Sequence, residues 1–335
     1  MLDPVPSERR AQVAAALLSA FGVTAPDAPP AQISGGMSGA ALFRIRVGGI
    51  AYILRLEPPA SPPFGDPVRA HACMQSAADA CLAPSVRFAD PATGVVIMDL
   101  VPEQPLADYR AGRQAMVVEL AQAVRLLHAT PAFPPAVDYL TGMDEIVRWF
   151  RGAGLSSPEA EELVARFERF RETYRTPPAD LVSSHNDLNA RNVLYDGRRL
   201  WLIDWDAAFL ADRYVDLAAA ANWFCRGPAE EDLLLRTYFL AEPTEARRSR
   251  LFVMRQVNYL FYGLMFALSG AAAATPGAAD PSRAQPHAVL RDELAAGRLD
   301  LWQAANRLAY GAALLREALA GFRSTDFADR LAAAA

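Results

Sequence analysis

The sequence predicts an α+β fold in which a β-rich segment precedes a mostly helical one. Residues 31–57 contain three β-like runs, and the second and third flank Gly48 and Gly49, a pair typical of a two-residue hairpin turn. Residues 85–101 predict another pair of strands. From residue 106 onward helical periodicity dominates, and only residues 183–206, SSHNDLNARNVLYDGRRLWLIDWD, keep β-like character.

Two helices accompany the β-rich segment. Residues 7–22 predict the first, with Ser7 as N-cap and Gly22 as stop, and residues 68–82 predict the second. Helical patterns in the later part of the chain cover residues 113–129, 143–154, 157–175 and most of 229–331. We therefore expect an N-terminal lobe over residues 1–100, a hinge near residues 98–105 and a helical C-terminal lobe over residues 101–335.

Composition narrows the class of protein. Of the 335 residues 52% are apolar and 21% charged, which suits a globular chain with a sizeable core, and the net charge of −5 argues against nucleic-acid binding. Three cysteines without metal-ligand spacing, Cys73, Cys81 and Cys225, predict free thiols in a reducing compartment. The most apolar stretch, residues 257–274, contains Asn258 and two glycines, so we expect no membrane span. A cytoplasmic protein is expected, of undetermined oligomeric state.

A turn folds the stretch 183–206 back on itself. Asp196 and Gly197 are a strong turn signal between two β-like runs. If these two residues alone form the loop, Asp204 pairs with Asn189, whereas a loop of four residues pairs Asp204 with Arg191. Either register returns Asp204 to the polar end of the hairpin.

The polar residues of this stretch have the chemistry of a metal site. Asp187, Asn192 and Asp204 supply two carboxylates and a carboxamide, and such oxygen ligands suit Mg²⁺, which also keeps waters and substrate phosphates. Magnesium on phosphates and a carboxylate that orients a hydroxyl are the parts that phosphoryl transfer needs. The alternative is that His185, Asp187 and Asn189 only bond to their own backbone in a tight turn.

The same residues carry a resemblance to a known family. HNDLNARN, residues 185–192, resembles the His-x-Asp-x4-Asn catalytic loop of kinases. With LIDWD at 202–206 and DRYVDLA at 212–218, the chain resembles the aminoglycoside phosphotransferase and choline kinase family, and the choline and ethanolamine kinase branch in particular. The resemblance implies a two-lobed protein-kinase-like fold, with nucleotide bound in the β-rich lobe. It also implies an enzyme that uses ATP and Mg²⁺ to phosphorylate a hydroxyl of a small molecule.

The resemblance assigns roles to four residues of the central stretch and to Asp216 beyond it. Asp187 is expected to be the catalytic base, and Asn192 and Asp204 to hold Mg²⁺. His185 is expected to support the loop, and Asp216 to cap the next helix.

Phosphate and adenine contacts are expected in the first lobe. SGGMSG, residues 34–39, lies where the family has its phosphate-covering loop, with Ser38 and Gly39 as contacts, although Gly/Ser hairpin loops are common. All 33 basic residues are arginine, and Arg55 occupies the place of the usual phosphate-binding lysine. The alternative for Arg55 is a surface position on an edge strand. Adenine is expected at the hinge around Met98 and Leu100.

The chain departs from the family pattern at the partner of Arg55. The resemblance leads us to expect a glutamate on the following helix, but that segment has no acid before Asp79. His71, Gln75 or Glu57 are the possible substitutes. The missing glutamate leaves a nucleotide-binding module without catalysis as an alternative function.

The sequence says least about the small molecule that accepts the phosphate. The resemblance favours an amino alcohol such as choline or ethanolamine, with an aminoglycoside or another small metabolite as the alternative. Asp206 is expected either to attract a cationic acceptor or to have a structural role, and Trp205, Tyr262 and Trp302 are aromatic candidates for contacting it. Helical spacing of Tyr262 and its aromatic neighbours predicts core packing as the alternative.

Overall fold

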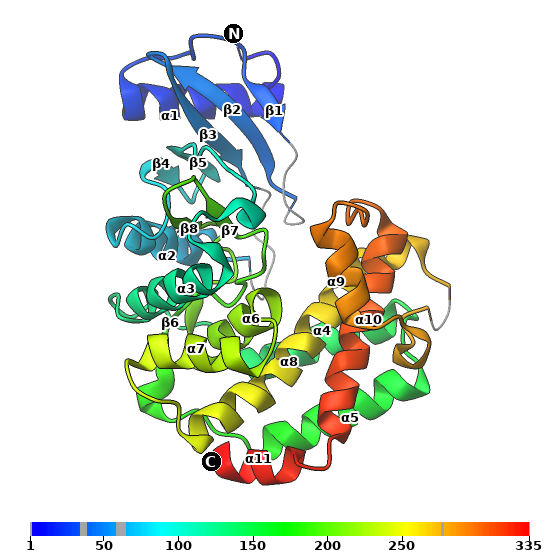
Figure 1. Cartoon of the computed structure of the whole chain (residues 1–335). Coiled ribbons are helices and arrows are strands. Elements are labelled where there is room, and N and C mark those ends of the chain that lie inside the picture. The colour runs from blue at the N-terminus through cyan, green and yellow to red at the C-terminus, as the bar shows by residue number, and fades with distance from the viewer. Residues whose placement is uncertain (1, 34–38, 58–64, 276–277, 335) are drawn as a thin grey trace. The chain divides into compact units, whose positions relative to one another are not determined.

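A five-stranded antiparallel sheet organises the N-terminal part of the computed structural model, which describes residues 2–33, 39–57, 65–275 and 278–334 (Figure 1). The strands follow the order β1-β2-β3-β5-β4, so that β3 lies in the middle. Their bounds are Ala31–Ile33 for β1, Ala41–Val47 for β2, Ile50–Leu56 for β3, Val86–Asp90 for β4 and Val95–Asp99 for β5.

The predicted hairpin at Gly48 and Gly49 is confirmed. Val47 pairs with Ile50, and both glycines have positive φ angles, 59° and 79°, which a two-residue hairpin turn requires. The carboxylate of Asp27 accepts hydrogen bonds from both glycine N–H groups, at 3.1 and 2.8 Å. These bonds fix the turn that sets the register of β3.

Helix α1, Arg10–Phe21, covers one face of this sheet. Its buried side chains pack against Leu54 and Leu56 of β3 and their neighbours. Gly22 ends α1 in the left-handed conformation, as predicted. The predicted N-cap is wrong, because Ser7 begins a separate 3-10 turn, Ser7–Arg9, and its hydroxyl bonds to Glu8 instead of the helix.

The other face of β3 presents the polar side chains. Successive side chains of a strand point to opposite faces, so Arg55 and Glu57 lie opposite Leu54 and Leu56. Helix α2, Pro67–Asp79, follows, and Asp66 caps it by accepting from the N–H groups of Val68 and Arg69.

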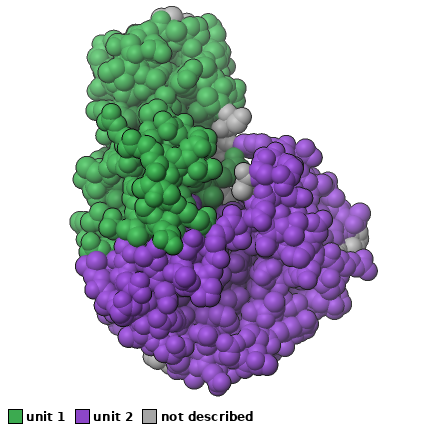
Figure 2. All heavy atoms as spheres, viewed as in Figure 1, with its two compact units in different colours: residues 1–136, 182–210 green, residues 137–181, 211–335 purple. Residues whose placement is uncertain are grey.

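The chain divides into two compact units, shown in different colours in Figure 2: residues 1–136 with 182–210, and residues 137–181 with 211–335. The first, unit 1, also contains α3, Gly112–His128, and the hairpin of β7, Val193–Tyr195, and β8, Leu200–Leu202. Strands β6, Leu181–Ser184, and β9, Phe209–Asp212, form another two-stranded sheet. The sequence had not indicated β9.

The second unit, unit 2, is helical. Its α-helices are α4, Tyr139–Gly152; α5, Pro158–Thr173; α6, Arg213–Phe224; α7, Pro228–Phe239; α8, Glu245–Ser269; α9, His287–Ala295; α10, Ala304–Arg323; and α11, Phe327–Ala334. The antiparallel sheet of unit 1 and the mostly helical unit 2 together confirm the predicted α+β class.

Helix α8 is the core helix of unit 2. By length and composition it could cross a membrane, but 72% of its most apolar window is buried inside the protein, as expected for a core helix. It packs closely on α10: a Cβ added to Gly311 would lie 2.6 Å from the backbone nitrogen of Ala267. The helix N-cap predicted at Asp216 is wrong, because Asp212 caps α6 and Asp216 is buried within its first turn.

A buried histidine lies in the same core. His287, 4% exposed, is 3.1 Å from the hydroxyl of Tyr310 through its Nε2 atom and packs edge-on against Tyr259. Burial, together with the positive charges of nearby arginines, first Arg291, lowers the pKa of His287 to about 4. His287 is therefore neutral at pH 7.

Candidate active site

The β7–β8 hairpin places the second acid of the central stretch. Tyr195 pairs with Leu200, which leaves a four-residue loop and confirms the second of the two predicted registers. The carboxylate of Asp196 holds this loop by accepting from the N–H groups of Arg198 and Arg199, both at 2.8 Å. One step along the ladder, the N–H of Ile203 donates to the carbonyl of Asn192 at 3.0 Å. Asp204 therefore follows directly after the residue that faces Asn192.

Two asparagines orient the carboxylate of Asp187. Asn189 Nδ2 donates to Asp187 Oδ1 at 2.9 Å, and Asn192 Nδ2 donates to Asp187 Oδ2 at 2.9 Å. Each oxygen thus accepts one amide hydrogen, which fixes the plane of the carboxylate. Sequence reasoning had given Asn189 no role. Its spacing of two residues from Asp187, the spacing of an Asx-type turn, was the available signal.

His185 and Asn186 tie the loop that carries Asp187 to the backbone of residues 203–207. The N–H of Asp187 lies 3.3 Å from His185 Nδ1, so the proton of a neutral ring is on Nε2, which is 2.9 Å from the carbonyl of Ile203. Asn186 has a left-handed φ of 63°, which asparagine tolerates, and its side-chain amide donates to the carbonyl of Ala207 at 3.0 Å. The structural role expected for His185 agrees with these contacts.

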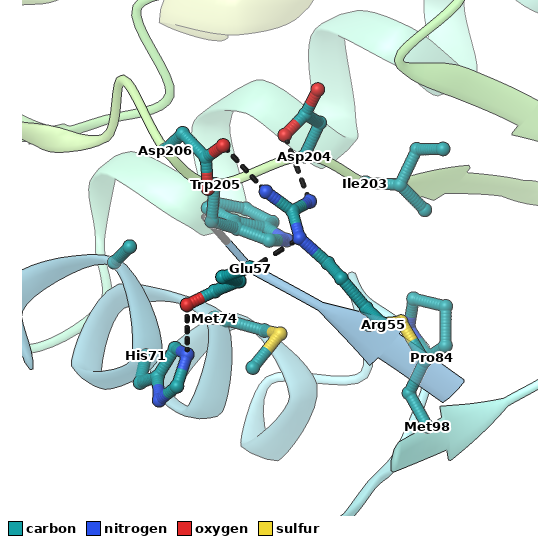
Figure 3. A pocket seen from close by; sticks show the side chains of 11 residues that line it. Arg55, Glu57, His71, Met74, Pro84, Met98, Ile203, Asp204, Trp205 and Asp206 are labelled. Carbon is teal, nitrogen blue, oxygen red and sulfur yellow. Dashed lines mark hydrogen bonds and ion pairs between the residues drawn. The ribbon is translucent and has the colours of Figure 1, made fainter. Parts of the chain in front are cut away.

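Arg55 reaches from β3 into a group of three carboxylates (Figure 3). Its NH1 atom is 3.1 Å from Asp204 Oδ1, its NH2 atom is 2.5 Å from Asp206 Oδ2, and its Nε is 3.5 Å from Glu57 Oε1. The Arg55 side chain is 12% exposed and lies on the central strand of the sheet, so the alternative of an exposed edge-strand arginine is wrong.

The charges of this group shift two pKa values. Burial alone would lower the pKa of the Arg55 guanidinium, but the carboxylates of Asp204, Asp206 and Glu57 together raise it above its usual value. Burial raises the pKa of Asp206, and the negative charges of Asp204 and Glu57 add to that effect against the opposing influence of Arg55. Arg55 is therefore permanently charged, and Asp206 takes up a proton more readily than an isolated aspartate.

Two of the three possible substitutes for the missing helix glutamate act together. Glu57 pairs with Arg55, and His71 Nε2 of α2 lies 3.0 Å from Glu57 Oε2. The third, Gln75, bonds instead to Asp79 on its own helix at 2.7 Å. Figure 3 shows Glu57 between the arginine and the histidine.

The oxygen atoms at the site fit a magnesium ion. The side-chain nitrogen of Asn192 donates to Asp187. Among the residues that the structure describes, no hydrogen bond reaches the Oδ1 atom of Asn192 or the Oδ2 atom of Asp204. Three carboxylates surround one guanidinium, so a divalent cation would balance their charge. In the described parts of the chain no group of three His, Cys, Asp or Glu side chains could hold a metal alone. A magnesium ion would therefore need Asn192 and phosphate oxygens as well.

Besides Arg55, one of the residues expected to bind nucleotide is placed at this group of carboxylates. Met98 lines the same pocket as Arg55 and Asp204, and Leu100 follows β5. Gly39 is exposed and has a positive φ of 77°. Ser38 lies outside the described residues, as does most of the predicted phosphate loop.

The four candidate acceptor contacts have different surroundings. Trp205 is buried with its ring centroid 4.6 Å from that of His185, the two rings tilted by 50°, and the half-exposed Asp206 binds Arg55. Tyr262 is buried against Trp223 in unit 2, in agreement with the core-packing alternative. Trp302, also in unit 2, is 52% exposed. Their contacts with an acceptor stay predictions.

Comparisons with known proteins agree with this geometry. A sequence model described as a phosphotransferase enzyme family matches residues 31–251. A search of curated proteins finds no significant match.

Solved structures resemble most of the chain. A choline/ethanolamine kinase family protein from Mesorhizobium loti has a TM-score of 0.67 at 22% identity, over 98% of both chains. A choline kinase from Streptococcus pneumoniae has a TM-score of 0.54 at 14% identity, over 87% of this chain and 99% of that one. A spectinomycin phosphotransferase solved with ADP and spectinomycin has a TM-score of 0.52 at 13% identity, over 85% and 93%. These similarities confirm the predicted two-lobed, protein-kinase-like fold.

Proposed function

The chain belongs to the phosphotransferase enzyme family, and from this premise we propose that it transfers the γ-phosphate of ATP to a hydroxyl group of a small molecule. The observation that carries the proposal is the orientation of Asp187 by two amide donors, on a loop whose hairpin returns Asp204 beside Asn192. A tight turn that served only its own backbone would not need both carboxylate oxygens of Asp187 held by side chains.

Each residue has a chemical task in this proposal. Asp187 orients the acceptor hydroxyl and accepts its proton as the oxygen attacks the γ-phosphorus of ATP, whose bond to the bridging oxygen breaks so that ADP leaves. Asn192 and Asp204 hold Mg²⁺ through the oxygens that the protein leaves unbonded, and Arg55 binds phosphate oxygens. When bound there, ATP would supply the phosphoryl group and Mg²⁺ would neutralise the negative charge on its oxygens. Ser38, Gly39, Met98 and Leu100 are the proposed remaining nucleotide contacts.

We propose an amino alcohol, choline or ethanolamine in kind, as the acceptor. The carboxylate of Asp206, which is half-exposed at the pocket, favours a cationic substrate, and the similarity to a choline/ethanolamine kinase family protein extends over 98% of both chains. An aminoglycoside is the second candidate, supported by the similarity to the spectinomycin enzyme. The alternative of an inactive nucleotide-binding module was suggested by the missing helix glutamate. Glu57 supplies a carboxylate next to Arg55, so that argument for inactivity no longer applies.

A ligand-stabilisation screen tests the proposal. The full chain is heated with Mg²⁺ and a non-hydrolysable ATP analogue, alone and with each of a panel of amino alcohols, sugars and aminoglycosides. We expect the analogue to raise the melting temperature only with Mg²⁺ present, and an amino alcohol to raise it further. Stabilisation by the analogue but by no acceptor, together with no transfer from ATP, would favour a nucleotide-binding module instead.

A further inference from the structure

Helix α2 lacks the acid that would hold Arg55, yet Arg55 is held. Glu57 follows β3 two residues after Arg55, so the two side chains leave the sheet on the same face. The distance of 3.5 Å between Arg55 Nε and Glu57 Oε1 is that of an ion pair. The carboxylate that pairs with Arg55 thus directly follows the strand that carries the arginine, and does not come from the helix.

Glu57 is the partner of Arg55 that has no other proposed task. Asp204 is needed for the metal, and the Asp206 side chain is 39% exposed at the pocket, where solvent weakens its attraction. The Glu57 side chain is 9% exposed, so its charge acts on Arg55 with less screening. When a metal engages Asp204, Glu57 is the buried carboxylate that remains beside Arg55.

His71 fixes Glu57 from the helix side. The His71 side chain is 8% exposed, and its Nε2 lies 3.0 Å from Glu57 Oε2. Its Nδ1 atom has no hydrogen bond within the described ranges, so Glu57 is the polar partner that orients this ring. A buried histidine with one carboxylate partner holds that carboxylate in one rotamer.

The same helix fixes the segment that carries the metal-site acids. Arg69 lies two residues before His71 on α2. Its guanidinium donates to the backbone carbonyl of Asp206 at 2.9 Å and to that of Ala208. Helix α2 therefore contacts both Glu57 and the chain beyond Asp204, and the helix sets the spacing between Arg55 and the metal-site acids.

We propose that Glu57 and His71 form a positioning pair that holds Arg55 toward the nucleotide phosphates in place of a helix glutamate. The inference rests on the proposed function, because it assumes that Arg55 binds phosphate. A positioning role and a purely electrostatic role of Glu57 predict opposite effects of its neutralisation on phosphate binding. If Glu57 were only a negative charge, neutralising it would strengthen binding of phosphates, whereas loss of a positioning residue weakens that binding.

The test measures binding by calorimetry of two probes to the full chain: the non-hydrolysable analogue AMP-PNP with Mg²⁺, and adenosine, which has no phosphates. We expect Glu57→Gln, which removes the ion pair with Arg55, to weaken Mg²⁺–AMP-PNP binding about tenfold. His71→Ala, which removes one hydrogen bond to the Glu57 carboxylate, should weaken it about threefold. Adenosine binding should be unchanged in both. His71→Gln, which keeps an N–H donor near the Nε2 position, should restore wild-type binding, and Gln75→Ala is the matched control on the same helix.

The outcomes separate the two proposals. If wild type fails to bind Mg²⁺–AMP-PNP, the proposed function is overturned and the inference falls with it. If wild type binds but Glu57→Gln binds equally or more tightly, the positioning pair is wrong while the function stands. An equal loss for adenosine, or a His71→Gln variant as weak as His71→Ala, also overturns the pair.

Discussion

His287 makes the stability of this protein depend on pH in a calculable way. The folded state holds the ring neutral, with its pKa lowered by burial to about 4, whereas the ordinary value of 6.5 applies when the chain is unfolded. As pH falls below 6.5 the unfolded chain takes up a proton that the folded chain refuses, so stability is complete above pH 6.5 and is lost as pH falls toward 4. Between pH 7.5 and pH 5 the loss from this one residue is about 2 kcal/mol.

Replacement by a residue that does not titrate isolates this contribution. His287→Gln keeps a donor for the hydroxyl of Tyr310 and removes the titration. Urea unfolding of both proteins at pH 7.5 and pH 5 gives the free energies of unfolding. We expect the wild type to lose about 2 kcal/mol more than the variant over this interval. Equal losses in the two proteins, or a His287 ring that titrates near pH 6.5 in NMR spectra of the folded protein, would refute the reasoning.

Three further predictions concern the catalytic loop, the metal and the helix core. Asn189→Ala removes the 2.9 Å hydrogen bond to Asp187, so phosphate transfer, followed as ADP release, should fall about tenfold while Mg²⁺–AMP-PNP affinity stays the same; an unchanged rate would deny Asn189 its orienting role. Asp204→Asn should raise the Mg²⁺ concentration needed for half-maximal AMP-PNP binding by about tenfold or more, and an unaltered Mg²⁺ requirement would argue against Asp204 as a ligand. Gly311→Ala should destabilise the protein by about 1–3 kcal/mol, because its Cβ meets α8 backbone at 2.6 Å, whereas Gly152→Ala, with nothing within 4 Å, should not; equal melting temperatures would contradict the close packing.

The order of elements in unit 1 could be predicted because local signals decide it. Gly48 with Gly49 and Asp196 with Gly197 are turn signals that depend on a few neighbouring residues. The register of the second hairpin stayed open, since the choice depends on whether Arg198 and Arg199 bond to Asp196, which composition does not determine.

The partner of Arg55 could be limited to three residues but not chosen. Glu57 shares a face with Arg55 by strand parity, yet whether His71 or Gln75 faces that carboxylate depends on the rotation of α2 against the sheet. That rotation is set by tertiary contacts such as those of Arg69 with the chain beyond Asp204. The N-cap predicted at Ser7 was wrong because a 3-10 turn, which the helical pattern of residues 7–22 does not distinguish from the helix, precedes α1.

The acceptor residues were least predictable, because an aromatic stripe on a helix is the same for a core and for a binding site. Tyr262 packs against Trp223 as a core residue would, and only burial distinguishes it from the exposed Trp302. Carboxylate and carboxamide side chains indicate a chemistry more sharply than aromatic patterns do, which is why the sequence allows Asp187, Asn192 and Asp204 to be proposed together as a site.

Transfer of phosphate to an identified acceptor is the most direct test of the proposed function. Wild type and Asp187→Asn are incubated with Mg²⁺, ATP and the amino alcohols that stabilise the protein, and mass spectrometry detects the phosphorylated product. Because Asn keeps the shape of Asp187 but cannot accept the hydroxyl proton, we expect product from wild type and a rate lower by a factor of about 100 or more in the variant, with AMP-PNP binding retained. Equal product from both proteins, or ADP formation without any phosphorylated acceptor, would contradict the assignment of Asp187 as the base of a small-molecule phosphotransferase.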